Sequence, residues 1–95
     1  MLKTTRTQRH ALSARLKALA DPTRLGILSQ LLAAPDDTCV CDIACCFDVG
    51  QPTISHHLKT LRQARLVRAQ RRGTWIHYRA DRQALEEVRR ALAEL

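Results

Sequence analysis

Long apolar runs are missing from this chain of 95 residues, and none approaches the ~18–20 residues that a membrane span needs. The N-terminal stretch, MLKTTRTQRH, is polar and basic with no apolar core behind it, which argues against a signal peptide. We therefore expect a cytoplasmic protein with no membrane partner, whose thiols stay reduced. Internal repeats and low-complexity segments are also absent, so one small domain over residues 1–95 is predicted.

Acidic residues are missing from the middle of the chain. No Asp or Glu occurs from Gln51 to Gly73, although the formal net charge of the whole chain is only +7. The same stretch holds six cations: Lys59, Arg62, Arg65, Arg68, Arg71 and Arg72. A basic composition alone indicates no more than solubility, but a block of one sign is typical of a surface that binds a polyanion.

Apolar residues recur at helical spacing in the first third of the chain. A first helix is predicted from about Arg6 to Ala20. A second begins at Asp21-Pro22, an N-cap followed by proline in the first turn, and ends before Pro35. The leucines expected to face inward from the second helix are Leu25, Leu28, Leu31 and Leu32.

Two further helices and a tight turn are predicted next. Thr38 is expected to cap a short helix that runs to about Phe47, and the turn over 48–50 contains glycine. A fourth helix follows with Pro52 in its first turn, and its apolar face consists of Ile54, Leu58 and Leu61. Two short helices joined in this way are the pattern of a helix-turn-helix.

The period changes from helix to strand after the fourth helix. Strand-like runs from Leu66 to Gln70 and from Thr74 to Arg79 predict a hairpin whose turn is 71–73. Helical spacing returns from Asp81, with Leu85, Val88, Leu92 and Leu95 on one face. Four helices, a hairpin and a last helix (ααααββα) predict a mainly α fold, the winged helix-turn-helix.

The fourth helix has the residues that a DNA-reading helix needs. Base edges are reached by short polar side chains near the N-terminus of such a helix, and phosphates by cations further along. The candidates for these contacts are Gln51, Thr53, Ser55, His56, Lys59 and Arg62. A solvated amphipathic helix would look similar, but the basic hairpin residues Arg71 and Arg72 favour DNA, because they suit backbone or minor-groove contact. His56 and His57 point ~100° apart, which makes them a poor chelating pair.

The cysteines are clustered at Cys39, Cys41, Cys45 and Cys46. In a reduced compartment this clustering favours metal or redox chemistry, and several thiolates favour soft ions. At ~100° per residue, Cys41 and Cys45 lie ~40° apart on one helical face, whereas Cys39 and Cys41 lie ~200° apart. If Cys39 and Cys41 bind the same ion, either Cys39 lies outside the helix or the first turn of the helix deforms on binding. That deformation would be transmitted to the DNA-reading helix. We expect a site of three thiolates: Cys39, Cys41 and Cys45.

Two other expectations concern the same cluster. The helix N-terminus should lower the pKa of thiols placed beside it, here Cys39 and Cys41. For Cys46 two interpretations stay open: it is buried in the core, where free cysteine packs well, or it replaces Cys45 as the third ligand. A purely structural role for all the cysteines stays open, whereas a zinc ribbon is disfavoured because the spacing lacks a second pair.

Four segments together resemble the ArsR/SmtB family of metal-sensing repressors: LKALADPTRLGILSQLL, TCVCDIACC, QPTISHHLKTLRQARLV and GTWIHYR. The resemblance implies a homodimer that pairs through its terminal helices, binds an inverted-repeat operator without ion, and dissociates when the ion binds. Cys39 and Cys41 match two cysteines of a motif that resembles both the arsenic-sensing and the cadmium/lead-sensing branches. The third cysteine position of the arsenic sensors is Ala44 here, with Cys45 next to it. The family's zinc site on the last helix is expected to be absent, because residues 81–95 contain no histidine.

The resulting hypothesis is a repressor, not an enzyme, that responds to arsenite or antimonite and has no organic cofactor. As(III) takes three thiolates in a pyramid, whereas zinc or cadmium usually takes a fourth ligand. The dimer is expected to form from the apolar faces of the first and last helices: Leu12, Leu16, Leu19, Leu85, Val88 and Leu92. The alternatives are a repressor of the same fold that responds to cadmium, lead, zinc or thiol oxidation, and, with little support, a thiol-metal enzyme or zinc-stabilised interaction module.

Overall fold

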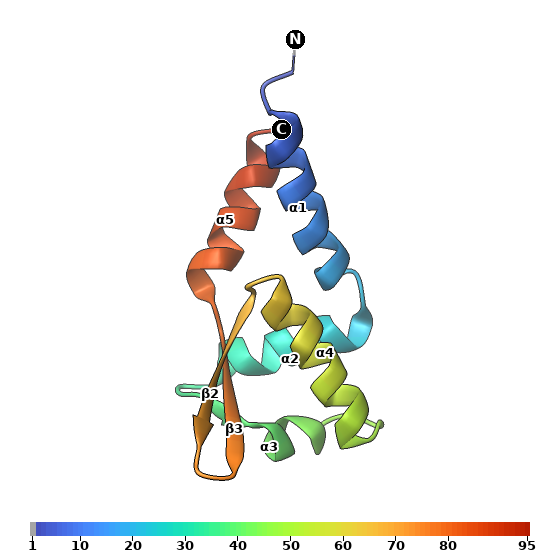
Figure 1. The fold of residues 1–95 in the computed structure, drawn as a ribbon, viewed down its shortest axis with the longest axis vertical. Coiled ribbons are helices and arrows are strands. Elements are labelled where there is room, and N and C mark those ends of the chain that lie inside the picture. Colours follow the sequence, from blue (N-terminus) through green and yellow to red (C-terminus); the bar gives the residue numbers. More distant parts are fainter. Residues whose placement is uncertain (1) are drawn as a thin grey trace.

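The computed structural model describes residues 2–95, with five helices and a three-stranded antiparallel sheet of order β1-β3-β2 (Figure 1). The elements are α1 (Arg6–Leu19), α2 (Pro22–Ala33), β1 (Thr38–Cys39), α3 (Val40–Ala44), α4 (Gln51–Gln63), β2 (Val67–Arg72), β3 (Trp75–Ala80) and α5 (Arg82–Ala93). The molecule is elongated, 50 × 23 × 20 Å, because α1 and α5 converge toward the chain ends while the other elements gather at the opposite end (Figure 1). Among residues 2–95, none of the helices has the length and apolar character needed to span a bilayer.

The first two helices confirm the predicted boundaries. Asp21 caps α2, and its side chain accepts a hydrogen bond of 3.0 Å from the Arg24 backbone N–H. The prediction of which α2 side chains face the core was partly wrong, because Leu25 is 53% exposed and Ile27 is fully buried. Leu25 lies ~160° around the helix from Ile27, so the stripe that buries Ile27, Leu28 and Leu31 leaves Leu25 outside.

The predicted third helix was wrong at both ends. Thr38 does not cap it: Thr38 and Cys39 form β1, which pairs with Tyr78 and His77 of β3, and α3 begins at Val40 and ends at Ala44. The edge of β3 offers backbone donors and acceptors that β1 satisfies. A strand of two residues shows no alternation, so sequence periodicity could not have revealed it.

The helix-turn-helix is confirmed around α4. Gly50 is its N-cap, Ile54, Leu58 and Leu61 are fully buried, and the helix packs against α3, β2 and α2. The turn before it is anchored by Phe47, whose ring lies over Gly26 of α2. A Cβ at Gly26 would come within 2.9 Å of that ring, so the close approach requires glycine.

The hairpin is confirmed, but its turn was misplaced. Arg71 and Arg72 belong to β2, where Arg72 pairs with Trp75, and the turn consists of Gly73 and Thr74. Gly73 has a φ of 63°, the left-handed conformation that two-residue hairpin turns demand. Arg71 and Arg72 therefore lie on a strand and not in the turn.

Asp81→Asn should make the free energy of unfolding less dependent on pH in the acid range. A hydrogen bond from the Ala84 backbone N–H (3.0 Å) and the guanidinium of Arg68 (3.1 Å) lower the pKa of Asp81 below its ordinary value of 3.8, against the opposing effect of burial. Between the folded pKa and 3.8 the unfolded chain binds the extra proton, so the wild type loses stability as pH falls through this range. Asparagine preserves the cap without the titration. Urea denaturation at a series of pH values measures this, and equal pH dependence in both proteins would contradict it.

Candidate DNA interface and thiol site

The exposed face of α4 carries the side chains predicted to contact DNA. Gln51, Thr53, His56, Lys59 and Arg62 are exposed, and Ser55 is partly exposed. The opposite face is the buried stripe that fixes the helix against the core. Among residues 2–95, no ion pair engages Lys59 or Arg62, so both cations are available to phosphates.

The two adjacent histidines have separate environments. His56 is exposed, which confirms that one of the pair faces outward. His57 is half-buried, with its Nδ1 3.1 Å from Nη1 of Arg24 and 4.0 Å from a carboxylate oxygen of Asp21. A guanidinium can only donate, so Nδ1 of His57 accepts. Arg24 also donates to the Ala18 carbonyl at the end of α1 (2.6 Å) and so joins α1, α2 and α4. Sequence periodicity gave no sign of this role.

The two hairpin arginines also differ. A 2.8 Å ion pair links Arg72 to Asp37, whose side chain is only 9% exposed. Arg71 is exposed, and no ion pair within residues 2–95 includes it. Of the two predicted DNA contacts from the hairpin, the structure therefore leaves one cation free and neutralises the other.

The structure brings Cys39 and Cys41 together. Their sulfur atoms lie 3.0 Å apart, because Cys39 has an extended backbone (φ −64°, ψ 143°) and precedes the first turn of α3. Of the two geometries that allow a shared ion, the structure has the one in which Cys39 lies off the helix. The pair converges without deforming the start of α3, so the predicted strain does not arise at these two residues.

Cys45 and Cys46 lie apart from that arrangement, just beyond the end of α3. Both are exposed, and their thiols lie 3.1 and 3.6 Å from the backbone carbonyl oxygen of Asp42. The prediction that Cys46 is buried was wrong, because α3 ends at Ala44 and Cys46 follows its last turn. Within residues 2–95, no group of three or more His, Cys, Asp or Glu side chains is positioned to hold a metal ion.

Two of the four thiols, those of Cys41 and Cys45, have a raised pKa. The hydrogen bond between the sulfurs of Cys41 and Cys39 raises the pKa of Cys41, and burial adds to the effect. A hydrogen bond with Cys46, followed by burial, raises the pKa of Cys45. For Cys41 the expected lowering of the pKa by the helix N-terminus was wrong, since the hydrogen bond with Cys39 and burial raise the pKa, and the neighbouring Cys39 and Asp42 charges add to the effect.

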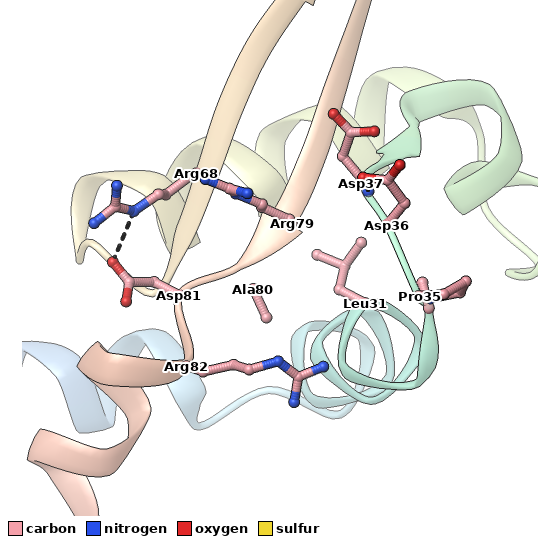
Figure 2. A pocket seen from close by; sticks show the side chains of 10 residues that line it. Leu31, Pro35, Asp36, Asp37, Arg68, Arg79, Ala80, Asp81 and Arg82 are labelled. Carbon is pink, nitrogen blue, oxygen red and sulfur yellow. Dashed lines mark hydrogen bonds and ion pairs between the residues drawn. The ribbon is translucent and has the colours of Figure 1, made fainter.

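A separate pocket of about 320 Å³ lies between the end of α2, the sheet and the start of α5 (Figure 2). Its walls carry both signs of charge: Asp36, Asp37, Asp81, Arg68, Arg79 and Arg82. Figure 2 shows Arg68 reaching toward Asp81, the pair described above. No cysteine lines this pocket, and its mixed charges favour neither an anion nor a cation.

Comparison with known proteins connects this geometry to a family. Residues 21–69 match the family described as bacterial regulatory protein, arsR family. The arsenical resistance operon repressor of Escherichia coli is 48% identical over 63 residues, which cover 66% of this chain and 53% of that protein. The chain thus spans about half the length of that relative. The protein of the same name from Bacillus subtilis is 41% identical over 80 residues, 84% of this chain and 72% of the relative.

Two other similarities are to a repressor with another name and to a solved structure. A transcriptional repressor SmtB homologue from Synechocystis is 44% identical over 61 residues, 64% of this chain and 45% of that protein. A solution structure from Mycobacterium bovis, described as a homodimeric winged helix-turn-helix DNA-binding domain, superposes with a TM-score of 0.74 and 31% identity. The superposition covers 98% of this chain and 84% of that one.

Proposed function

The chain belongs to the arsR family of bacterial regulatory proteins, and from this premise we propose that it represses transcription until As(III) or Sb(III) binds its thiols. The observation that carries the proposal is the thiol pair of Cys39 and Cys41, 3.0 Å apart at the first helix of the helix-turn-helix. A regulator of this family binds DNA and is not an enzyme. The relatives named for arsenical resistance support the choice of inducer.

We propose that residues 1–95 act in the cytoplasm as one winged helix-turn-helix domain, paired as a homodimer through α1 and α5. Val88, expected on the dimer face, is instead buried in the core of the single chain, whereas Leu92 and the neighbouring Leu95 are 45% and 63% exposed on the α5 side, where a second copy would cover them. The homodimeric Mycobacterium neighbour supports this assembly. Two α4 helices related by a two-fold axis would read an inverted-repeat operator in successive major grooves.

The proposed ligand site consists of Cys39, Cys41 and Cys45. Arsenous acid, As(OH)₃, would condense with three thiols: three As–S bonds replace three As–O bonds, and each thiol proton leaves with a hydroxyl as water. No electron is transferred. Cys39 and Cys41 already converge, so the step that costs free energy is recruitment of Cys45.

Recruitment of Cys45 is the proposed link to DNA. The Cys45 thiol leaves the Asp42 carbonyl oxygen, and the end of α3, where the Cys45 backbone N–H bonds the Cys41 carbonyl (3.2 Å), must rearrange. The chain from Cys46 to Gly50 leads directly into α4. A shift at the end of α3 therefore moves the helix that reads DNA, whereas binding at Cys39 and Cys41 alone would not.

The alternative inducer is a divalent soft ion such as cadmium, lead or zinc, which clustered thiols also bind. Thiols bind such an ion as thiolates and release their protons to solvent, so affinity falls as pH falls. The raised pKa values of Cys41 and Cys45 increase that cost. Condensation with arsenous acid releases water instead of protons, and is therefore less penalised by protonated thiols. A third possibility is thiol oxidation, for which the exposed pair Cys45 and Cys46 is the accessible target.

A DNA-release assay tests the proposal. The probe is an operator duplex selected from a random-sequence pool with the reduced wild-type protein, and release is followed by fluorescence anisotropy. We expect arsenite and antimonite to release the duplex at lower concentrations than cadmium, lead or zinc, and with weaker dependence on pH. Release by a divalent ion at lower concentration than arsenite would favour the alternative, and release by peroxide alone would favour a redox response.

A further inference from the structure

Asp37 is an enclosed carboxylate beside the hairpin of β2 and β3. Its Oδ2 atom lies 2.8 Å from Nη2 of Arg72, and its Oδ1 atom lies 3.9 Å from Nδ1 of His77. The Asp37 side chain is 9% exposed, whereas that of Arg72 is 51% exposed. A buried carboxylate needs a cation to offset the loss of water, so this pair is held more firmly than one on the open surface.

Strand alternation places the two hairpin arginines on opposite faces of the sheet. Successive side chains of β2 alternate, so Arg71 shares a face with Val67 and Ala69, the face that packs on the core with α4. The register agrees, since Ala69 pairs with the buried Tyr78. Arg72 shares the other face with Gln70, whose partner His77 also contacts Asp37.

We propose that Asp37 is a positioning residue that withholds Arg72 from DNA. The inference rests on the proposed function, because it assumes that the hairpin lies against DNA beside α4. The hairpin's phosphate contact is then made by Arg71, on the face shared with α4. Arg72 binds Asp37 across the sheet and secures the hairpin to the segment that leads into β1 and Cys39.

The proposal predicts how many phosphates the hairpin contacts. Each phosphate neutralised by the protein contributes about 0.9 to the slope of log K against log salt concentration. Arg71→Ala should reduce the magnitude of that slope by about 1. Arg72→Ala should leave the slope unchanged, because Arg72 is held by Asp37 and contacts no phosphate.

The decisive comparison is Asp37→Asn against Asp36→Asn. Both variants remove one negative charge from neighbouring positions, but no ion pair within residues 2–95 includes Asp36, and only the first variant frees Arg72. With the selected operator duplex and no arsenite, we expect Asp37→Asn to steepen the slope by about 1 relative to Asp36→Asn. Adding Arg72→Ala to Asp37→Asn should return the slope to the value of Asp36→Asn. A purely structural role for Asp37 would change affinity without this reversal.

Two results would overturn the inference while the proposed function stands: equal slopes for Asp37→Asn and Asp36→Asn, or a reduced slope for Arg72→Ala alone. Circular dichroism of each variant establishes that the compared proteins are folded, and the single variant Arg72→Ala tests the same claim if Asp37→Asn unfolds. A wild-type protein that selects no duplex from the pool would overturn the proposed function and this inference together.

Discussion

Cys41→Ser should bind the operator with wild-type affinity and fail to release it when arsenite is added. Cys41 lies on α3 and contributes no side chain to the exposed face of α4, so the DNA contacts are unaffected. Its sulfur is one of the two that already converge, 3.0 Å from that of Cys39. A serine hydroxyl in that place is a hard donor that does not match a thiophilic ion.

The expected effect is large. Loss of a residue that merely supports a ligand lowers metal affinity about 10–100-fold, so loss of a ligand itself should raise the half-release concentration of arsenite at least about 100-fold. Cys46→Ser is the matched control, because Cys46 is exposed beyond the end of α3 and outside the proposed site. It should release as the wild type does. Normal release by Cys41→Ser would refute the ligand assignment, and loss of release by Cys46→Ser would move the third thiolate to Cys46.

Leu58→Ala should lower the free energy of unfolding by about 2–5 kcal/mol, the usual cost of a cavity left by a buried leucine. Leu58 is fully buried at the centre of α4, between Ile54 and Leu61. The substitution removes no DNA contact, so weaker operator binding should follow only from loss of folded protein. Urea denaturation measures the change in stability.

Leu25→Ala is the control with the same substitution on another helix. Leu25 is 53% exposed, so the change should remain within about 0.5 kcal/mol. Similar losses in the two variants would mean that α4 is not packed as described. The comparison also tests which side of α2 faces the core.

The helices that position the DNA interface could be predicted from sequence because each carries a local signal. Asp21 and Pro22 begin α2 by capping chemistry, and the spacing of Ile54, Leu58 and Leu61 determines which face of α4 is buried. The polar residues on the remaining face of α4 then follow from geometry. The hairpin was predicted from its strand formers, but the turn shifted because Arg71 and Arg72 also fit a strand.

The arrangement of the cysteines could not be predicted, since it depends on a long-range pairing. Thr38 has the chemistry of an N-cap, yet pairing with Tyr78 of β3 places it in a strand. That pairing places Cys39 outside the helix and beside Cys41. The angles between residues of one helix indicated this arrangement only as one of two alternatives. The contacts of Asp37 with Arg72 and of Arg24 with His57 likewise join segments far apart in sequence and leave no local pattern.

The central claim is that three thiols of one chain hold the inducer, and X-ray absorption at the arsenic edge tests it most directly. The measurement counts the sulfur and oxygen neighbours of arsenic in the protein loaded with one equivalent of arsenite. We predict three sulfur neighbours and no oxygen in the wild type, with one sulfur replaced by oxygen in Cys45→Ser. Two sulfurs and an oxygen in the wild type would show that Cys39 and Cys41 bind alone, and would contradict the proposed movement of α3.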